Sequence, residues 1–485
     1  MYLINRNHKF HYEMENLLRI FFPEKIIVTD EIPEGEDYVL TELSDRITVT
    51  LHFAGESYTA YYINEENETE DSILERKMAV LMFNLLKEYT GYTPPWGILT
   101  GVRPAKLMTN LIKDMGEEAA LGYFINELKV SEEKTALARL VAKAENPIIK
   151  AASEPESFSL YISIPFCPTR CSYCSFISHS NESAKKLIPE YVEKLCEELK
   201  LTGDIARNVK LKLESIYIGG GTPTVLSAEQ LKKITDCVKE SFELVNIKEY
   251  TIEAGRPDSV TDEKFRVMME SGCTRISINP QTFNDSVLTE IGRKHTSQMT
   301  LDAMELARKN GFSNINMDLI AGLPTDTLDS FKNTLDTALS LSPENITVHT
   351  LALKRSSNIV TENRRTNSGA LASDMLSLAQ SLLTESGYVP YYMYRQSKCL
   401  GNLENVGWAK KGYEGLYNVY MMEECHTVLS VGAGAVIKLK SPEGKEIERI
   451  FNYKYPYEYI SGFDEILKRK EYIYEFYEKF RQGGI

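Results

Sequence analysis

Alternating apolar and polar positions predict a small mixed module at the start of the chain. The alternation covers 38–42, 47–53 and 57–63, with Gly55 in a turn between the last two runs, and a period of two is typical of strands with one buried face. An amphipathic helix is expected near 13–22. Residues 1–80 are therefore expected to form a small α/β module.

A helical spacing follows from about 72 to 148, and we assign residues 81–152 to a helical linker region. Thr93-Pro94-Pro95-Trp96-Gly97 interrupts it, and the next residues, 99–104 (LTGVRP), predict an ordered loop that leads into a helix. We expect a docking loop packed by Trp96. A direct role for Arg103 in holding an anionic substrate is the alternative.

Residues 153–355 alternate strands and helices. Ser227 with Gln230 predicts a capping box at a helix start, and Thr261 with Gly272 predicts the two ends of another helix. Six such units indicate an α/β fold with a partial (β/α)6 barrel, in which chemistry occurs at the C-terminal ends of the strands. The strands are expected at 159–164, 215–218, 250–253, 275–278, 314–320 and 346–351.

The remaining residues, 356–485, predict a mainly helical C-terminal domain. This part contains a glycine motif at 431–435 (VGAGA) and a tyrosine-rich segment with Tyr388, Tyr391, Tyr392 and Tyr394. We expect the tyrosines to pack an interface, with a catalytic role as the alternative.

Composition narrows the class of protein. A chain of 485 residues suggests two to four domains, and 43% hydrophobic residues suffice for sizeable cores. The net charge of −14 argues against broad binding to nucleic acid or anionic membranes. The sequence shows neither a signal-peptide pattern nor an apolar run of about 18 residues, so we expect a cytoplasmic protein.

Three of the eight cysteines stand close together directly after the first barrel strand. Cys167, Cys171 and Cys174 have the spacing C-x3-C-x2-C, and three thiolates can hold three irons of a [4Fe–4S] cluster and leave the fourth iron open. Structural thiols or an incomplete zinc site are the alternatives, although zinc usually shows a second Cys/His pair. The others are expected to be small buried hydrophobes: Cys196, Cys237, Cys273, Cys399 and Cys425.

Other strand ends also carry candidate chemistry. The glycines at 219–221 are followed by Thr222-Pro223, and they suit either a tight turn or a close approach of backbone to a ligand. Glu253 ends the third strand, where it can accept a hydrogen bond from an ammonium or hydroxyl group. A salt bridge from Glu253 to Arg256 or Arg275 is the alternative.

Several strings along the chain resemble the oxygen-independent coproporphyrinogen III oxidase family of radical S-adenosylmethionine (SAM) enzymes. They are YISIPFC with the following cysteines, GGGTPT, RISINPQTF, IGRKHT and MDLIAGLP, within about 155–440. TGVRP, EAGRP and GNLENVG are similar to the HemZ branch over nearly the whole chain. The resemblance implies an oxygen-labile [4Fe–4S] cluster on Cys167, Cys171 and Cys174, and one or two molecules of SAM.

The resemblance also implies roles for individual residues. Tyr161 matches the tyrosine at the cluster and sulfonium, which we take as the catalytic residue, and Tyr173 matches the aromatic near the SAM adenine. The remaining positions that match SAM-binding residues are Gly220, Gly221, Thr222, Glu253, Gln281, Arg293, Asp318 and Ala352.

The implied reaction is the oxidative decarboxylation of coproporphyrinogen III propionates to vinyl groups. It needs a low-potential electron donor such as flavodoxin or ferredoxin. Its substrate carries four carboxylates, for which guanidinium and ammonium groups are suitable partners. Candidates are Arg293, Lys354, Arg355 and Arg395, with a solvated pair as the alternative for Lys354 and Arg355.

Two positions depart from the oxidase pattern. Ser163 stands where the oxidase has histidine, and Phe176 stands where it has a fourth cysteine and resembles the haem chaperone (HemW) branch. Two further hypotheses therefore stay open: a haem-binding chaperone, or a radical SAM enzyme for another tetrapyrrole or an RNA base. The conceivable haem ligands are His179, His295, His349 and His426.

Overall fold

The computed structural model describes residues 1–482 apart from 24–25, 64–69, 153, 175–185, 363–365 and 397. Phe176 and His179 lie outside the described residues. The chain forms two compact units, one of 1–142 with 393–404 and one of 143–392 with 405–485. The smaller unit contains the expected segment 1–80 and the expected linker up to residue 142, whereas residues 143–152 belong to the larger unit. Of the expected C-terminal domain, 393–404 belongs to the smaller unit. No helix within the described ranges is long and apolar enough to cross a membrane.

The smaller unit contains a five-stranded sheet in the order β2-β1-β3-β4-β5. Apolar residues of β3 and β4 bury one face against helices α1 (His11–Phe21) and α2 (Asp71–Thr90). The three expected strands are confirmed. β1 and β2 were not predicted, because five and two residues are too few for a periodic signal. The strands are β1 (Tyr2–Arg6), β2 (Ile27–Val28), β3 (Tyr38–Leu43), β4 (Arg46–Phe53) and β5 (Glu56–Ile63).

The loop that contains LTGVRP is held by buried groups of the same unit. Trp96 is buried and donates from Nε1 to Oε2 of Glu404 at 2.6 Å, and Lys134 pairs with the same carboxylate at 2.8 Å. Arg395 donates to the carbonyls of Leu99 and Gly101. These contacts favour the docking loop. The following helices are α3 (Pro104–Met115), α4 (Glu117–Asn126) and α5 (Glu132–Ala151).

The larger unit is built on an eleven-stranded sheet in the order β12-β13-β11-β10-β9-β8-β7-β6-β14-β15-β16. Its six consecutive parallel strands confirm the partial barrel expected from the sequence. They are β6 (Ser157–Ile164), β7 (Lys212–Gly220), β8 (Glu249–Glu253), β9 (Arg275–Ser277), β10 (Ile315–Ala321) and β11 (Asn345–Thr350).

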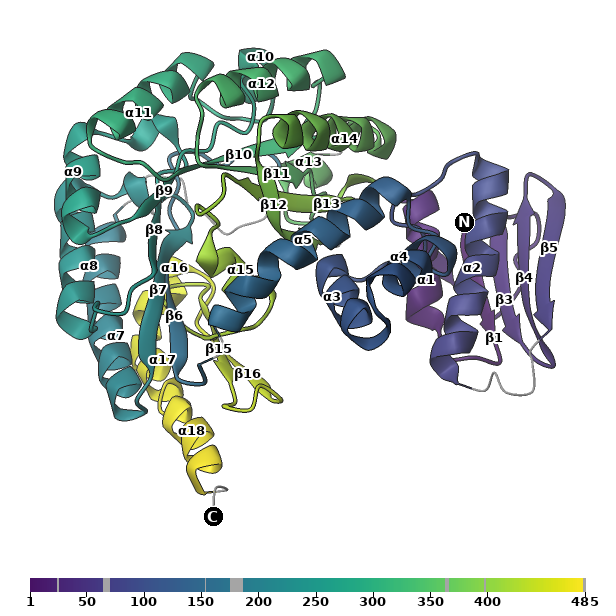
Figure 1. Ribbon diagram of the computed structural model, residues 1–485, viewed down its shortest axis with the longest axis horizontal. Coiled ribbons are helices and arrows are strands. Elements are labelled where there is room, and N and C mark those ends of the chain that lie inside the picture. The colour runs from purple at the N-terminus through teal and green to yellow at the C-terminus, as the bar shows by residue number, and fades with distance from the viewer. Residues whose placement is uncertain are drawn as a thin grey trace. The chain divides into compact units, whose positions relative to one another are not determined.

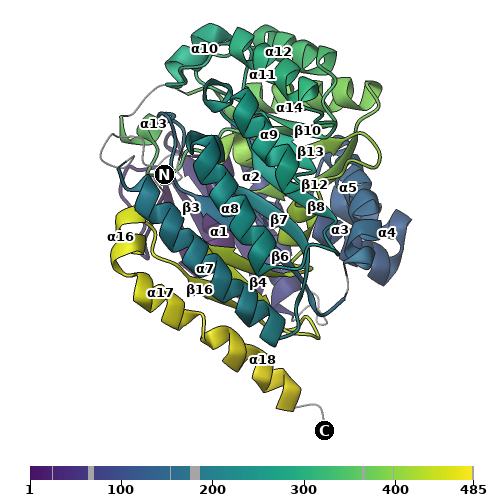
Figure 2. The same cartoon turned by 90° about the vertical axis from the view of Figure 1, so that its left-hand side faces the viewer.

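Helices follow the barrel strands, and Figure 2 shows α7, α8 and α9 side by side over the outer face of the sheet. The capping box of Ser227 and Gln230 is present, and Thr261 caps a helix that ends at Gly272 in the left-handed conformation. The helices are α7 (Ile188–Asn208), α8 (Ala228–Ser241), α9 (Asp262–Ser271), α10 (Asp285–Glu290), α11 (Ser297–Lys309) and α12 (Leu328–Ser340).

The C-terminal part contains helices, as expected, but also five strands that extend the barrel sheet at both edges (Figure 1). β14 runs parallel to β6, with Leu429 opposite Leu160, and β13 runs antiparallel to β11. The strands are β12 (Val389–Arg395), β13 (Glu404–Ala409), β14 (Thr427–Val431), β15 (Val436–Lys440) and β16 (Ile447–Phe451). The helices are α13 (Asn358–Thr361), α14 (Gly369–Glu385), α15 (Leu416–Met422), α16 (Pro456–Ser461), α17 (Phe463–Arg469) and α18 (Tyr472–Gln482).

A buried ion pair joins the last helices to the barrel. Glu198 of α7 and Lys470 are both fully buried, with 3.0 Å between Oε1 and Nζ. Glu198 also accepts hydrogen bonds from the Gly432 amide and the Tyr459 hydroxyl. The pair therefore holds the VGAGA turn against β6, where Ser163 donates to the Ala433 carbonyl at 2.8 Å.

Candidate active site

The six barrel strands present a polar inner face. Side chains of neighbouring strands are joined there by hydrogen bonds, for example Ser159 to Ser215 at 2.7 Å and Asn316 to Ser277 at 3.1 Å. The alternate positions on the other face are fully buried apolar residues: Leu160, Ile162, Ile216, Ile218, Ile252, Ile276, Leu319 and Ile346. The inside of this barrel is therefore suited to a polar ligand. The hydrophobic core of the unit lies on the other face of the sheet, between the strands and the helices.

Partly buried polar groups gather on this inner face towards the strand ends. Tyr217 of β7 donates to Oε1 of Glu253 at 2.5 Å. On β10, Asp318 accepts from Asn316 at 2.8 Å and lies 3.7 Å from Nε2 of His349 on β11. The ring of Tyr161 on β6 stacks beside Tyr217, with centroids 6.2 Å apart. Tyr161, Glu253 and Asp318 thus face one interior.

The pKa values of Glu253 and Asp318, the two carboxyl groups of this interior, are shifted in opposite directions. Burial raises the pKa of Glu253 to about 7, and the negative charge of Asp318 adds to the rise. Burial acts in the same direction on Asp318, but hydrogen bonds and charge from His349 and Asn316 outweigh it and lower its pKa. A salt bridge does not account for Glu253, because it accepts from Tyr217 while Arg256 pairs with Asp258.

Gly220, the last residue of β7, and Gly221 after it lie directly against the cysteine loop. The Gly221 amide donates to the Ile164 carbonyl at 2.8 Å, and the Thr222 amide donates to the Phe166 carbonyl at 2.7 Å. A Cβ on Gly221 would meet the Phe166 carbonyl oxygen at 2.5 Å. Gly220 has φ +103°, which other residues rarely adopt. Glycine is therefore required here by close backbone packing. The hydroxyl of the next residue, Thr222, lies 3.3 Å from Sγ of Cys167.

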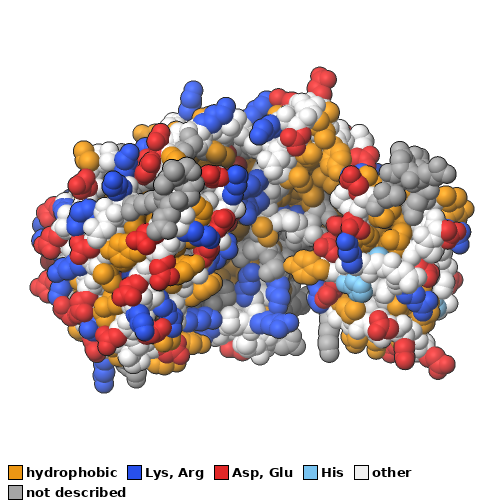
Figure 3. Space-filling view, turned by 90° about the horizontal axis from the view of Figure 1, so that it is seen from below, with side chains coloured by type: hydrophobic (Ala, Val, Ile, Leu, Met, Phe, Trp, Pro, Cys, Tyr) orange, Lys and Arg blue, Asp and Glu red, His pale blue; other side chains and the backbone are white. Residues whose placement is uncertain are grey.

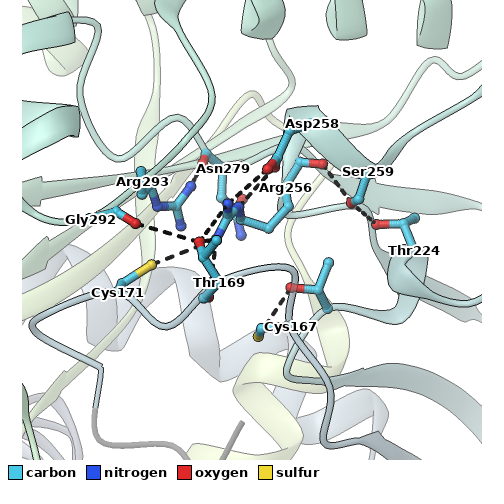
Figure 4. A network of polar contacts seen from close by, with 11 residues as sticks. Cys167, Thr169, Cys171, Thr224, Arg256, Asp258, Ser259, Asn279, Gly292 and Arg293 are labelled. Carbon is cyan, nitrogen blue, oxygen red and sulfur yellow. Dashed lines mark hydrogen bonds and ion pairs between the residues drawn. The ribbon is translucent and has the colours of Figure 1, made fainter. Parts of the chain in front are cut away.

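Arg256, which the sequence analysis did not single out as functional, holds the other end of the cysteine loop (Figure 4). Its guanidinium makes a forked pair with Asp258, with both N–O distances 2.9 Å. It also donates to Oγ1 of Thr169 at 3.1 Å and approaches Sγ of Cys171 at 3.9 Å. The sequence offered one hint of this role: Arg256 stands three residues after the end of a strand.

A second arginine reaches the same cysteine. Arg293 is buried and donates to the Asn279 carbonyl at 2.7 Å. Burial would lower its pKa, but the neighbouring Tyr173 and Cys171 raise it above the usual range. Tyr173 has a raised pKa, chiefly because of burial. Two guanidinium groups, those of Arg256 and Arg293, therefore lie close to the Cys171 sulfur.

Gln281 has the geometry of a ligand-binding residue. It is 7% exposed, has φ +68°, and is held by backbone hydrogen bonds to Asp318 and Ile320. Its side-chain Oε1, like Nε of Arg293, has no hydrogen-bond partner among the described residues. Buried polar atoms are normally paired, and strained non-glycine residues concentrate at functional sites.

These residues fit a cysteine-bound cluster with SAM beside it. Within the described ranges no three Cys, His, Asp or Glu side chains converge on a single metal ion. A [4Fe–4S] cluster does not need such convergence, because each thiolate binds a different iron. Hydrogen bonds to Cys167 and Cys171, two nearby guanidinium groups and unpaired polar atoms on Gln281 and Arg293 suit a cluster and a polar cofactor.

Other candidates take different places. Ala352 follows β11 and is partly exposed; Lys354 is likewise partly exposed, and Arg355 is exposed. Arg395 is buried, and its guanidinium donates to the carbonyls of Leu99, Gly101 and Asn402. Those bonds hold a loop, so Arg395 is not suited to a substrate carboxylate.

Comparison with known proteins establishes the family. Residues 161–338 match the model of the radical SAM superfamily. The chain is 34% identical to the oxygen-independent coproporphyrinogen-III oxidase-like protein HemZ of Bacillus subtilis, over 97% of each chain. The chain belongs to this coproporphyrinogen-III oxidase-like family of radical SAM proteins. It is therefore an oxidoreductase whose cofactors are a [4Fe–4S] cluster and SAM.

Two other groups of relatives share part of the chain. The haem chaperone HemW of Haemophilus influenzae is 33% identical over 65% of this chain and 77% of its own. An oxygen-independent coproporphyrinogen III oxidase of Cereibacter sphaeroides is 27% identical over 60% and 64%. The solved structure of Escherichia coli coproporphyrinogen III oxidase (HemN), a radical SAM enzyme, has the same fold, with TM-score 0.51, 23% identity and coverage of 66% and 72%.

Proposed function

We propose that this enzyme converts propionate side chains of coproporphyrinogen III to vinyl groups by oxidative decarboxylation. The observation that carries the proposal is the match to the HemZ protein along 97% of both chains, whereas the HemW match leaves about a third of this chain uncovered. A polar barrel interior beside the cysteine loop supports a reaction on a bound ligand there.

The chain's own residues have distinct tasks in this proposal. Cys167, Cys171 and Cys174 hold the cluster, with Thr222 and Arg256 donating to two of the sulfurs. When bound, the cluster and SAM would supply the radical chemistry needed to remove a hydrogen atom from the substrate. Tyr161 and Glu253 bind and orient the cofactor.

Partners follow from this chemistry. The reaction needs a low-potential donor of the flavodoxin or ferredoxin type. The substrate carboxylates need cations, for which the partly exposed Lys354 and the exposed Arg355 after β11 remain candidates. Nucleic acid is a poor partner: basic and acidic side chains are mixed over the left-hand part of the face seen in Figure 3, and the net charge of the chain is −14.

Haem transfer is the second candidate, favoured by the 33% identity to HemW and by Ser163 and Phe176. The described histidines differ in how accessible they are to a ligand. His295 is buried with its pKa lowered to about 3, chiefly by burial, and His426 shares a hydrogen bond with Ser159. His349 is partly exposed on the barrel's inner face and is the better placed of these three to meet haem.

The deciding experiment is anaerobic. Reconstituted protein is given reductant, SAM and coproporphyrinogen III, and tetrapyrroles and 5′-deoxyadenosine are followed by mass spectrometry. Vinyl-bearing product that is lost in Cys171→Ala supports the proposal. Formation of 5′-deoxyadenosine with untouched porphyrinogen contradicts it. Stoichiometric haem binding without porphyrinogen conversion would support the chaperone instead.

A further inference from the structure

Tyr417 brings a side chain from the C-terminal part into the barrel. It is the second residue of α15, and its ring stacks on Tyr217 with centroids 4.6 Å apart and an interplanar angle of 25°. It also lies parallel to Tyr161, with centroids 6.3 Å apart. Three nearly parallel aromatic rings from β6, β7 and α15 therefore form one cluster on the inner face.

Buried contacts fix the position of Tyr417. The carboxylate of Glu249, at the start of β8, accepts from the amides of Leu416 and Tyr417 at 2.8 and 3.1 Å. Gly415 leaves no room for a side chain, since a Cβ there would meet Nη1 of Arg275 at 2.3 Å. Because Glu249 stands at the N-terminal end of its strand, α15 is anchored at that end. The Tyr417 ring reaches inward to Tyr161 and Tyr217.

The Tyr417 hydroxyl has no hydrogen-bond partner within the part of the chain that the structure describes. The residue is only 5% exposed, and an unpaired buried hydroxyl is destabilising. Burial raises the pKa of Tyr417 well above its usual range, and the nearby Tyr161 and Glu253 act in the same direction. The hydroxyl is therefore a neutral donor close to those two residues.

We propose that the Tyr417 hydroxyl donates a hydrogen bond to SAM bound against Tyr161 and Glu253. A cofactor seated on those two residues reaches this cluster of rings and supplies the acceptor that the protein lacks. The stacked rings explain the placement of Tyr417 but not its hydroxyl, because phenylalanine would stack equally well. Nothing in this proposal depends on the identity of the tetrapyrrole.

The test removes the hydroxyl and keeps the ring. SAM affinity of the cluster-reconstituted Tyr417→Phe protein is measured by equilibrium dialysis without reductant or tetrapyrrole. We expect the Kd for SAM to rise about 5–20-fold, because the variant loses one buried hydrogen bond to the cofactor. The melting temperature of the ligand-free protein should stay equal or rise by about 1–3 °C, since an unpaired polar group is removed.

Two controls make the outcome decisive. Tyr420→Phe changes the same residue type on the same helix, where the ring lies 4.0 Å from His426, and it should leave SAM affinity within about twofold. Glu253→Gln should weaken SAM binding. Unchanged affinity in Tyr417→Phe would overturn the proposal, as would a fall of several degrees in the melting temperature of its ligand-free form. Because no tetrapyrrole is present, failure of porphyrinogen conversion does not affect either result.

Discussion

The Nη1 atom of Arg256 lies 3.9 Å from Sγ of Cys171, although 85 residues separate them in the chain. The same guanidinium is oriented by the Asp258 carboxylate and donates to Thr169. The turn after β8 therefore supports the cysteine loop after β6 before any cluster is bound. Groups in this position around a metal centre commonly determine how well it is retained.

We expect Arg256→Lys to lose iron to a chelator about tenfold faster than the unchanged protein. An ammonium cannot make the forked pair with Asp258 and also reach Thr169. Iron release from reconstituted protein measures this. Arg266→Lys is the matched control, because that arginine makes an exposed pair with Asp262 on α9. Equal release from both variants would contradict the role of Arg256.

Gly221→Ala is expected to destabilise the protein by about 1–3 kcal/mol and to abolish SAM binding. The new Cβ would meet backbone oxygens of Phe166 at 2.5 Å and Ile164 at 2.8 Å, and backbone cannot rotate away as a side chain does. Urea unfolding and SAM dialysis measure the two effects. Gly101→Ala, with open space around the Cβ, should change neither. Normal SAM binding in Gly221→Ala would place the cofactor elsewhere.

SAM binding should depend on pH through Glu253. With its pKa raised to about 7 by burial, the carboxyl is protonated below that pH and cannot accept hydrogen bonds as a carboxylate. The Kd for SAM should therefore rise below pH 7, approaching about tenfold per pH unit. Dialysis between about pH 6 and 8 measures it. If the Kd for SAM depended on pH in the same way in Glu253→Gln and in the unchanged protein, the role of Glu253 would be refuted.

The same group predicts the sign of a stability effect. Its folded pKa exceeds the ordinary 4.5, so the folded state binds the proton more tightly. That contribution to stability is fully present below pH 4.5 and is lost as pH rises towards 7. Replacing Glu253 by glutamine should remove this loss. As pH rises from 4.5 to 7, the free energy of unfolding of the ligand-free variant should therefore increase relative to that of the unchanged protein, which urea unfolding measures.

Ser163→His restores the oxidase residue but should cost about 1–3 kcal/mol. Ser163 donates to the Ala433 carbonyl at 2.8 Å, and its Cβ is 3.2 Å from the site of a Cβ on Gly432, which leaves an imidazole little space. Ser163→Ala, which loses only the hydrogen bond, should cost about 1 kcal/mol. Urea unfolding compares them. A histidine variant as stable as the alanine variant would show that the VGAGA turn adapts.

Lys470→Met should cost about 3–5 kcal/mol, because it leaves the carboxylate of Glu198 buried without its cation. Lys468→Met, which alters an exposed lysine two residues earlier, is the control and should be nearly neutral. Chemical denaturation of both variants measures the difference. Similar stability of the two would mean that the donors Gly432 and Tyr459 are sufficient for Glu198.

Local pattern was enough for the six barrel strands, the helix caps at Ser227 and Thr261, and the cysteine spacing. Each of these is encoded within a few neighbouring residues, as periodicity or as a capping residue at a fixed offset. The strands β12 to β16 were missed in a part expected to be mainly helical. The turn between β14 and β15 was taken only as a glycine motif, because glycines at 432 and 434 mark a turn without showing what it connects.

The sequence by itself determined which residue types stand at the strand ends, and therefore the cluster, the cofactor and the family. Only the tertiary structure decided which of them meet. Arg395 donates to loop carbonyls, Arg256 reaches Cys171, and Tyr417 stacks on Tyr217 from 200 residues further along the chain. Such contacts depend on how distant segments pair and pack around one sheet, and side-chain partners at that separation leave no periodic trace in the sequence.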